Sequence, residues 1–153
     1  MYICSNSKFS IVKTSVFDVS SYILSKTGAI TSMKLQKLVY YCQAWSLVWD
    51  DSALFGEKIE AWANGPVVPD LYQEHKGKYY VDKVKGSINN LTPNQQETID
   101  KVLEALGDKS SKWLIDLTHL EDPWIEARKG LAPSERGNKE ITHFSMAEYY
   151  SAL

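Results

Sequence analysis

The chain has 153 residues, a formal net charge of −2, 44% hydrophobic and 24% charged residues, and an aromatic share of 12%. These values are typical of one soluble domain, and the near-neutral charge argues against sequence-independent binding to nucleic acid, which needs clustered Lys and Arg. The sequence shows no apolar run of about 18 residues, no basic-then-apolar leader and no Cys/His metal spacing, and Cys4 and Cys42 do not suggest a disulfide framework, so we expect a cytoplasmic protein without a membrane span.

Helical periodicity predicts two helices after a mixed polar segment over 1–13. The first spans about 15–26. The second spans about 32–49, with Thr31 or Ser32 as its N-cap, and is expected to be the central core element. Its apolar residues at i, i+3, i+4 and i+7 spacing are Leu35, Leu38, Val39, Cys42, Trp45 and Trp49. Lys34 and Lys37 are therefore expected on its solvated face.

The next segment combines a short strand with a strong turn. Residues 57–62 alternate polar and less polar side chains, which favours a strand. Asn64-Gly65-Pro66 then interrupts the chain, because glycine tolerates positive φ and proline disfavours a helical conformation in the residue before it. Pro69 suits the first turn of a short helix over 69–75. This pattern predicts a rigid loop between two packed elements.

The remaining elements are predicted mainly from capping signals. A short extended segment is expected over 79–84. Thr92-Pro93 with Gln95 forms a capping-box signature, and that helix should end at Gly107. Further helices are expected over about 110–118, from a cap at Asp122, and from a cap at Ser145, with a loop over 130–138 between the last two. The fold class expected is mainly α, a compact single helical domain with a small β-hairpin as its candidate β-element.

Three histidines are candidates for acid/base or metal chemistry. His75, His119 and His143 each have a carboxylate nearby in the sequence, but none has a ligand-like partner at i+4. We favour solvated or structural roles for all three, with His119 bonded to the backbone near a capping Asp122. An enzyme that uses His75 or His119 with a carboxylate is kept as an alternative hypothesis.

Two groups of side chains suggest binding surfaces. A basic aromatic strip of Lys26, Lys34, Lys37, Tyr40 and Tyr41 is typical of a nucleic-acid-binding helix, but the apolar pattern of 32–49 favours a core helix. Aromatic rings are enriched at binding hot spots. We expect one or two of the following to be exposed and most to be buried: Trp62, Tyr72, Tyr79, Tyr80, Trp113 and Trp124.

Segments in three regions of the chain, in order and at matching spacing, resemble the motifs of one bacterial family. Met33–Tyr41 resembles a K-L-Q-K-L-aromatic helix, and Glu60–Tyr72 resembles a G-P-V loop with the helix after it. Leu117–His119 and Pro123–Arg128 resemble L-T-H and P-W-x-x-A-R motifs. The family is the Panacea domain, the SocA-like antitoxin domain common in bacteria and prophages. The resemblance divides the chain into two parts, an N-terminal extension (1–14) and an antitoxin domain (15–153). The extension would be either a toxin-contacting arm or a simple tail.

This resemblance implies a bacterial or prophage antitoxin that binds and neutralises a cognate protein toxin, with no enzymatic activity, cofactor or metal. The alternative is a proteolytic adaptor or phage-associated protein that delivers a partner to a protease. Neither a membrane partner nor, without a protein partner, a nucleic-acid partner is expected. Trp62, Asn64 and Gly65 would shape the loop, Lys34 and Lys37 would offer charge, and Trp124 with Arg128 would offer an aromatic–guanidinium surface.

Overall fold

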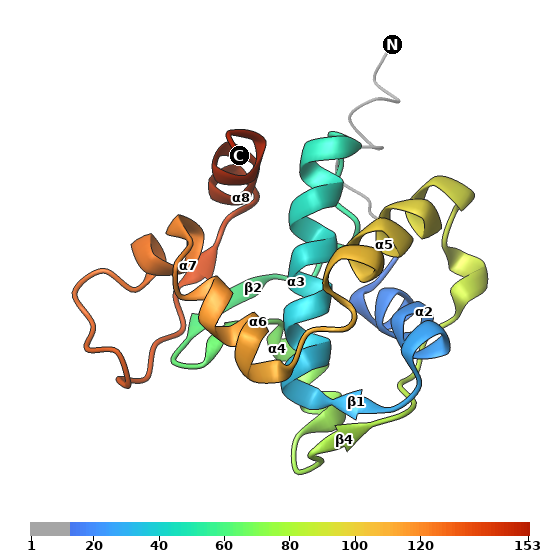
Figure 1. The fold of residues 1–153 in the computed structure, drawn as a ribbon, viewed down its shortest axis with the longest axis horizontal. Coiled ribbons are helices and arrows are strands. Elements are labelled where there is room, and N and C mark those ends of the chain that lie inside the picture. The colour runs from blue at the N-terminus through green and yellow to red at the C-terminus, as the bar shows by residue number, and fades with distance from the viewer. Residues whose placement is uncertain (1–12) are drawn as a thin grey trace.

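The computed structural model describes residues 13–153 as a mainly helical domain, which confirms the expected fold class. Helix α3 (Ser32–Trp49) stands in the middle of the molecule. Helices α2 (Val16–Thr27) and α5 (Pro93–Leu106) lie on one side of it, and α6 (Ser111–Thr118), α7 (Asp122–Ala127) and α8 (His143–Ser151) lie on the other (Figure 1). The predicted extension lies almost wholly outside the described residues.

Helix α3 is buried on nearly every side. Its residues from Leu35 to Ala44 are all buried, although the sequence pattern predicted a single apolar stripe. This helix also buries the polar side chains of Gln36, Lys37 and Gln43, and each of these needs a partner. The prediction that Lys37 lies on a solvated face is therefore wrong, because its side chain is fully buried.

Two small antiparallel sheets accompany the helices. Strands β2 (Ile59–Trp62) and β3 (Gly65–Val67) form a small hairpin, in which Trp62 pairs with Gly65 across a two-residue turn. The predicted rigid loop at Asn64-Gly65-Pro66 is therefore wrong in part, because Gly65 and Pro66 already belong to a strand. Strand β5 (Glu140–Ile141) extends this sheet on the other side of β2. The second sheet pairs β1 (Ile30–Thr31) with β4 (Tyr80–Val81). The short helix α4 (Pro69–His75) lies between β3 and β4 in the sequence.

The capping predictions are partly confirmed. Helix α5 begins with the predicted capping box of Thr92 and Gln95. Two other predictions are wrong. Glu121 occupies the N-cap position of α7 without a side-chain cap bond, so Asp122 is already helical. Helix α8 is capped by Thr142, whose hydroxyl accepts from the Ser145 amide at 3.1 Å, so Ser145 lies within its first turn.

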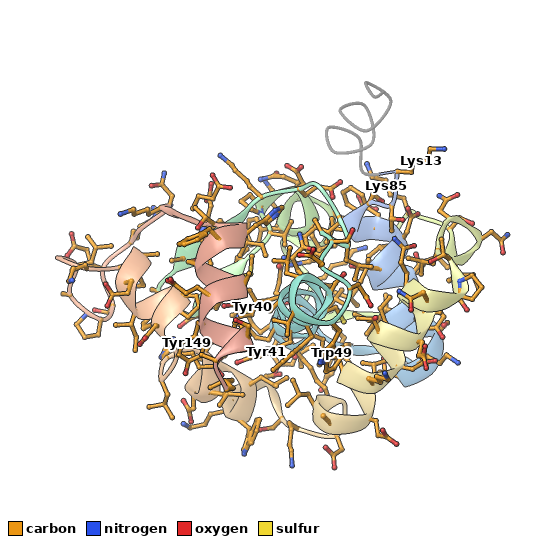
Figure 2. All side chains as sticks on the ribbon, turned by 90° about the horizontal axis from the view of Figure 1, so that it is seen from above. Lys13, Tyr40, Tyr41, Trp49, Lys85 and Tyr149 are labelled. Carbon is orange, nitrogen blue, oxygen red and sulfur yellow. The ribbon has the colours of Figure 1, made fainter. Side chains whose placement is uncertain are left out.

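A buried tyrosine–carboxylate network joins α3, α7 and α8. Tyr40 and Tyr41 point from α3 toward α8 (Figure 2). The hydroxyls of Tyr41 and Tyr150 both donate to Glu121 Oε1, at 2.6 and 2.7 Å, and Tyr40 and Tyr150 bond to each other at 3.0 Å. Burial raises the pKa of Glu121, while the two donated bonds act in the opposite direction. Tyr40 and Tyr41 are core residues, as the favoured interpretation expects.

Candidate functional site

A cleft of about 710 Å³ opens where the hairpin, the end of α4 and the loop after α7 meet the first turns of α3. Its volume is within the range of about 300–1,000 Å³ that is common for binding pockets. We call it the hairpin cleft. It is lined by Ser32, Met33, Gln36, Glu60, Trp62, Ala63, Asn64, Val67, Tyr72, His75, Lys76, Gly77, Lys78, Arg136, Gly137 and Asn138.

Two aromatic rings form one wall of the hairpin cleft. The rings of Trp62 and Tyr72 meet edge to face, with centroids 5.0 Å apart, and both side chains are half-buried. The Trp62 indole N–H donates to Glu60 Oε1 at 2.9 Å, which fixes the ring orientation. The sequence placed these rings on either side of the turn, and the structure brings them together.

Gln36 and His75 lie at the base of the cleft. The Gln36 side chain accepts from the Val68 amide at 2.8 Å and donates to the Val68 carbonyl at 3.3 Å. Its amide nitrogen is also 2.9 Å from His75 Nε2, which must accept this bond because the amide donates. Burial lowers the pKa of His75, which favours the neutral ring. His75 therefore has a structural bond at the nitrogen that a base or ligand would need.

The start of strand β3 packs against the buried Lys37 side chain. Lys37 Nζ donates to the Pro66 carbonyl at 3.1 Å, and burial lowers the pKa of this amine to about 7. Gly65 has a φ of +113°, and a Cβ there would lie 2.5 Å from Lys37 Cε and 3.0 Å from Thr118 Oγ1. Position 65 thus requires glycine for its backbone conformation and for the close approach of Lys37.

Trp124 and Arg128 donate hydrogen bonds to the backbone of strand β2. The Trp124 indole donates to the Trp62 carbonyl at 2.8 Å, and the Arg128 guanidinium donates to the Ala61 carbonyl at 3.0 Å. The same guanidinium also binds the carbonyls of Ala132 and Glu135 in the following loop. The two side chains do pair, with the guanidinium 5.2 Å from the Trp124 ring centre. The prediction that they form a surface is wrong, because both are buried.

His119 also packs against Trp124. Its ring stacks on Trp124 at 4.0 Å between centres. Its buried Nε2 has no hydrogen-bond partner among residues 13–153. Burial lowers the pKa of His119, and the Asp116 carboxylate acts in the opposite direction. This arrangement suits a neutral ring in a packing role.

The seven sequence-predicted site residues lie in three different settings. Trp62 and Asn64 line the hairpin cleft, and Asn64 is exposed. Four others are buried behind or beneath the hairpin: Lys37, Gly65, Trp124 and Arg128. Lys34 is half-buried in the first turn of α3 and does not line the cleft.

Sequence reasoning missed the three cations of the cleft, Lys76, Lys78 and Arg136. Lys76 and Lys78 directly follow α4, so the short basic run after His75 was a usable signal. Arg136 is 58 residues further along the chain than Lys78, and only the fold brings it to the same cleft.

The six candidate aromatic anchors are more exposed than expected. Trp113, Tyr79 and Tyr80 are exposed, Trp62 and Tyr72 are half-buried, and Trp124 alone of the six is buried. Tyr79 and Tyr80 lie at the small β1–β4 sheet, which is too narrow to cover their rings. The expectation that most of these rings fill the core is therefore wrong.

Other chemistry finds little support in the described part of the chain. Residues 13–153 hold no group of three or more His, Cys, Asp or Glu side chains that could bind a metal ion. Cys42 is buried, and burial raises the pKa of its thiol, which disfavours the reactive thiolate. Across the same residues, no helix has the length and apolar character needed to cross a membrane.

Comparisons with known proteins point to one family. The family model described as "Antitoxin SocA-like, Panacea domain" matches residues 35–125, a stretch that includes the hairpin and α4. Antitoxin SocA of Caulobacter vibrioides (strain NA1000 / CB15N) is 30% identical over 124 residues, which cover 69% of this chain and 66% of that relative. The chain thus spans just under two thirds of the relative's length. No solved structure gives a significant match.

Proposed function

Because the chain belongs to the family of SocA-like antitoxins with a Panacea domain, we propose that it neutralises a cognate protein toxin by direct contact. The observation that carries this proposal is the family match over residues 35–125. The buried, hydrogen-bonded His75 agrees with a protein that acts by binding. The proposed encounter takes place in the cytoplasm, where both proteins would be synthesised.

The hairpin cleft is the contact surface that we assign to the toxin. Clefts that combine aromatic rings with a few polar groups are the usual form of a binding site. Trp and Tyr are enriched among residues whose loss weakens protein complexes most, and Trp62 and Tyr72 supply both here. Asn64 presents an exposed polar side chain at the turn.

The buried members of the predicted set act indirectly in this proposal. Lys37 fixes the start of β3 through the Pro66 carbonyl, and Gly65 makes room for it. Trp124 and Arg128 fix β2 through the carbonyls of Trp62 and Ala61. A contact surface that is rigid before binding loses less conformational entropy on association. Lys37, Gly65, Trp124 and Arg128 therefore position the hairpin. Trp62 and Asn64 are the residues that we expect to contact the toxin.

Co-expression with the product of the adjacent gene tests the proposal. Growth of the cells and co-purification of the two proteins should be measured together, since neutralisation by contact requires both rescue and a stable complex. A nanomolar complex corresponds to about −12 kcal/mol of binding free energy. Rescue without a stable complex would contradict neutralisation by contact and would favour degradation of the toxin.

Replacement of Trp62 by Ala should weaken the complex about 30-fold, because truncation of a hot-spot ring costs about 2 kcal/mol. Trp113→Ala is the matched control, since Trp113 is an exposed ring on α6 and does not line the hairpin cleft. Thermal denaturation of both variants separates a binding defect from a folding defect. Equal affinities for the two folded variants would remove Trp62 from the contact surface.

A further inference from the structure

The hairpin cleft carries an excess of positive charge, with three cationic side chains and one carboxylate in its lining. Its exposed cations are Lys76, Lys78 and Arg136, and none of them belongs to an ion pair within residues 13–153. The carboxylate that lines the cleft is Glu60, which already accepts from the Trp62 indole at 2.9 Å and lies 3.5 Å from Lys58 Nζ. The whole chain has a net charge of −2, so this local excess of positive charge runs against the overall balance.

The first turn of α3 adds to the positive potential. Ser32 and Met33 line the cleft, and they are the first two residues of this helix of 18 residues. The amide groups at a helix N-terminus carry a partial positive charge that attracts anions. No acidic residue occupies the first turn of α3 to neutralise it. The Ser32 and Lys34 amides already donate to the Tyr79 carbonyl and to Thr31 Oγ1, so the helix end adds its dipole to the field of the three cations rather than a set of free donors.

We propose that the hairpin cleft receives an acidic peptide segment of the protein partner, with its carboxylates at Lys76, Lys78 and Arg136 and an apolar or aromatic side chain against Trp62 and Tyr72. This inference rests on the proposed function, because it names the part of the toxin that the cleft would recognise. A single-stranded nucleic acid would also supply anions and rings. The net charge of −2 disfavours that polyanion, and a short acidic peptide carries far less charge to repel.

Charge reversal at the cleft tests the inference in the complex with the adjacent gene's product. The variant is Lys76→Glu/Lys78→Glu/Arg136→Glu, and all three side chains are exposed, so the fold should be retained. The control is Lys83→Glu/Lys112→Glu/Lys129→Glu, which changes the net charge equally at exposed positions outside the cleft. The cleft variant should bind about 100-fold more weakly, and the control less than about 5-fold more weakly. Equal losses in the two variants would overturn the inference while leaving direct neutralisation intact.

A peptide titration decides the inference even if the wild-type chain forms no complex with that protein, an outcome that would refute only the proposed function. The probe is the acetylated peptide Glu-Asp-Phe-Glu-Asp, compared with Gln-Asn-Phe-Gln-Asn, and the readout is the NMR signal of the Trp62 indole N–H. The acidic peptide should shift this signal, and the shift should be lost in the cleft variant and at 1 M salt, where the Debye length is about 3 Å. No shift, an equal shift with the neutral peptide, or stronger binding of oligo-dT than of the acidic peptide would overturn the inference.

Discussion

Replacement of Lys37 by Met should stabilise the protein at pH 7. It should also remove the rise in the free energy of unfolding that the wild type shows above pH 7. Lys37 Nζ donates to the Pro66 carbonyl and has no carboxylate partner within 4.0 Å among residues 13–153. Burial lowers the pKa of this amine from 10.5 to about 7. Methionine has a similar length and flexibility and carries no charge.

The sign of the pH effect follows from the two pKa values. The unfolded chain holds the Lys37 proton up to about pH 10.5, and the folded chain releases it near pH 7. The free energy of unfolding should therefore rise with pH between these values, and the full penalty is present below pH 7. That penalty is about 4 kcal/mol at pH 7, from 1.36 kcal/mol for each pKa unit. Methionine removes it but leaves the Pro66 carbonyl unpaired, at a cost of about 1–3 kcal/mol.

Urea denaturation at pH 7 and pH 9 measures both parts of this prediction. Lys37→Met should raise the free energy of unfolding by about 2 kcal/mol at pH 7. Between pH 7 and pH 9 the free energy of unfolding of the wild type should rise by about 2 kcal/mol relative to that of the variant, because only the wild type has Lys37 to titrate. The other titrating groups are common to both proteins. A difference between the two proteins that is constant with pH would refute the depressed pKa of Lys37.

Three further substitutions probe the support of the hairpin. Gly65→Ala forces a Cβ against Lys37 at a φ of +113° and should lower the free energy of unfolding by at least about 2 kcal/mol in urea titrations; unchanged stability would refute the close contact. His119→Phe keeps the stack on Trp124 and removes the unpartnered Nε2, so thermal denaturation should show equal or slightly higher stability, and a clear loss would reveal a hidden bond. A lysine at position 128 cannot donate to the Ala61 and Ala132 carbonyls together, which should loosen the loop that contains Ala132. The Glu135 amide donates to the Ala132 carbonyl, so it should exchange with solvent faster in Arg128→Lys, and unchanged exchange would contradict the bridging role of Arg128.

The sequence predicts most of the helices because their signals are local. The capping box of Thr92 and Gln95, the proline start of α4 and the turn at Gly65 each depend on a few neighbouring residues. The pairing of β1 with β4 joins Ile30 to Val81, and β5 joins β2 from Ile141, and no local pattern predicts these contacts. Such short strands form because the surrounding helices bring their backbones together.

The candidate site is predicted less completely than the fold. Periodicity identified α3 as the core helix, but a helical wheel places a lysine in solvent, and Lys37 is buried because the hairpin covers it. The P-W-x-x-A-R segment was expected to offer a surface, but the side chains of Trp124 and Arg128 are buried and donate to backbone carbonyls of the hairpin. The cluster of Lys78 and Arg136 depends on tertiary structure, so one sequence cannot indicate it.

The most direct test of toxin neutralisation through the hairpin cleft is calorimetric titration of the purified chain with the product of its adjacent gene. Neutralisation through the cleft predicts a saturable complex of nanomolar Kd, weakened about 30-fold by Trp62→Ala and unaffected by Trp113→Ala. Rescue of cells from the toxin without a complex in calorimetry would contradict it, as would wild-type affinity in both tryptophan variants.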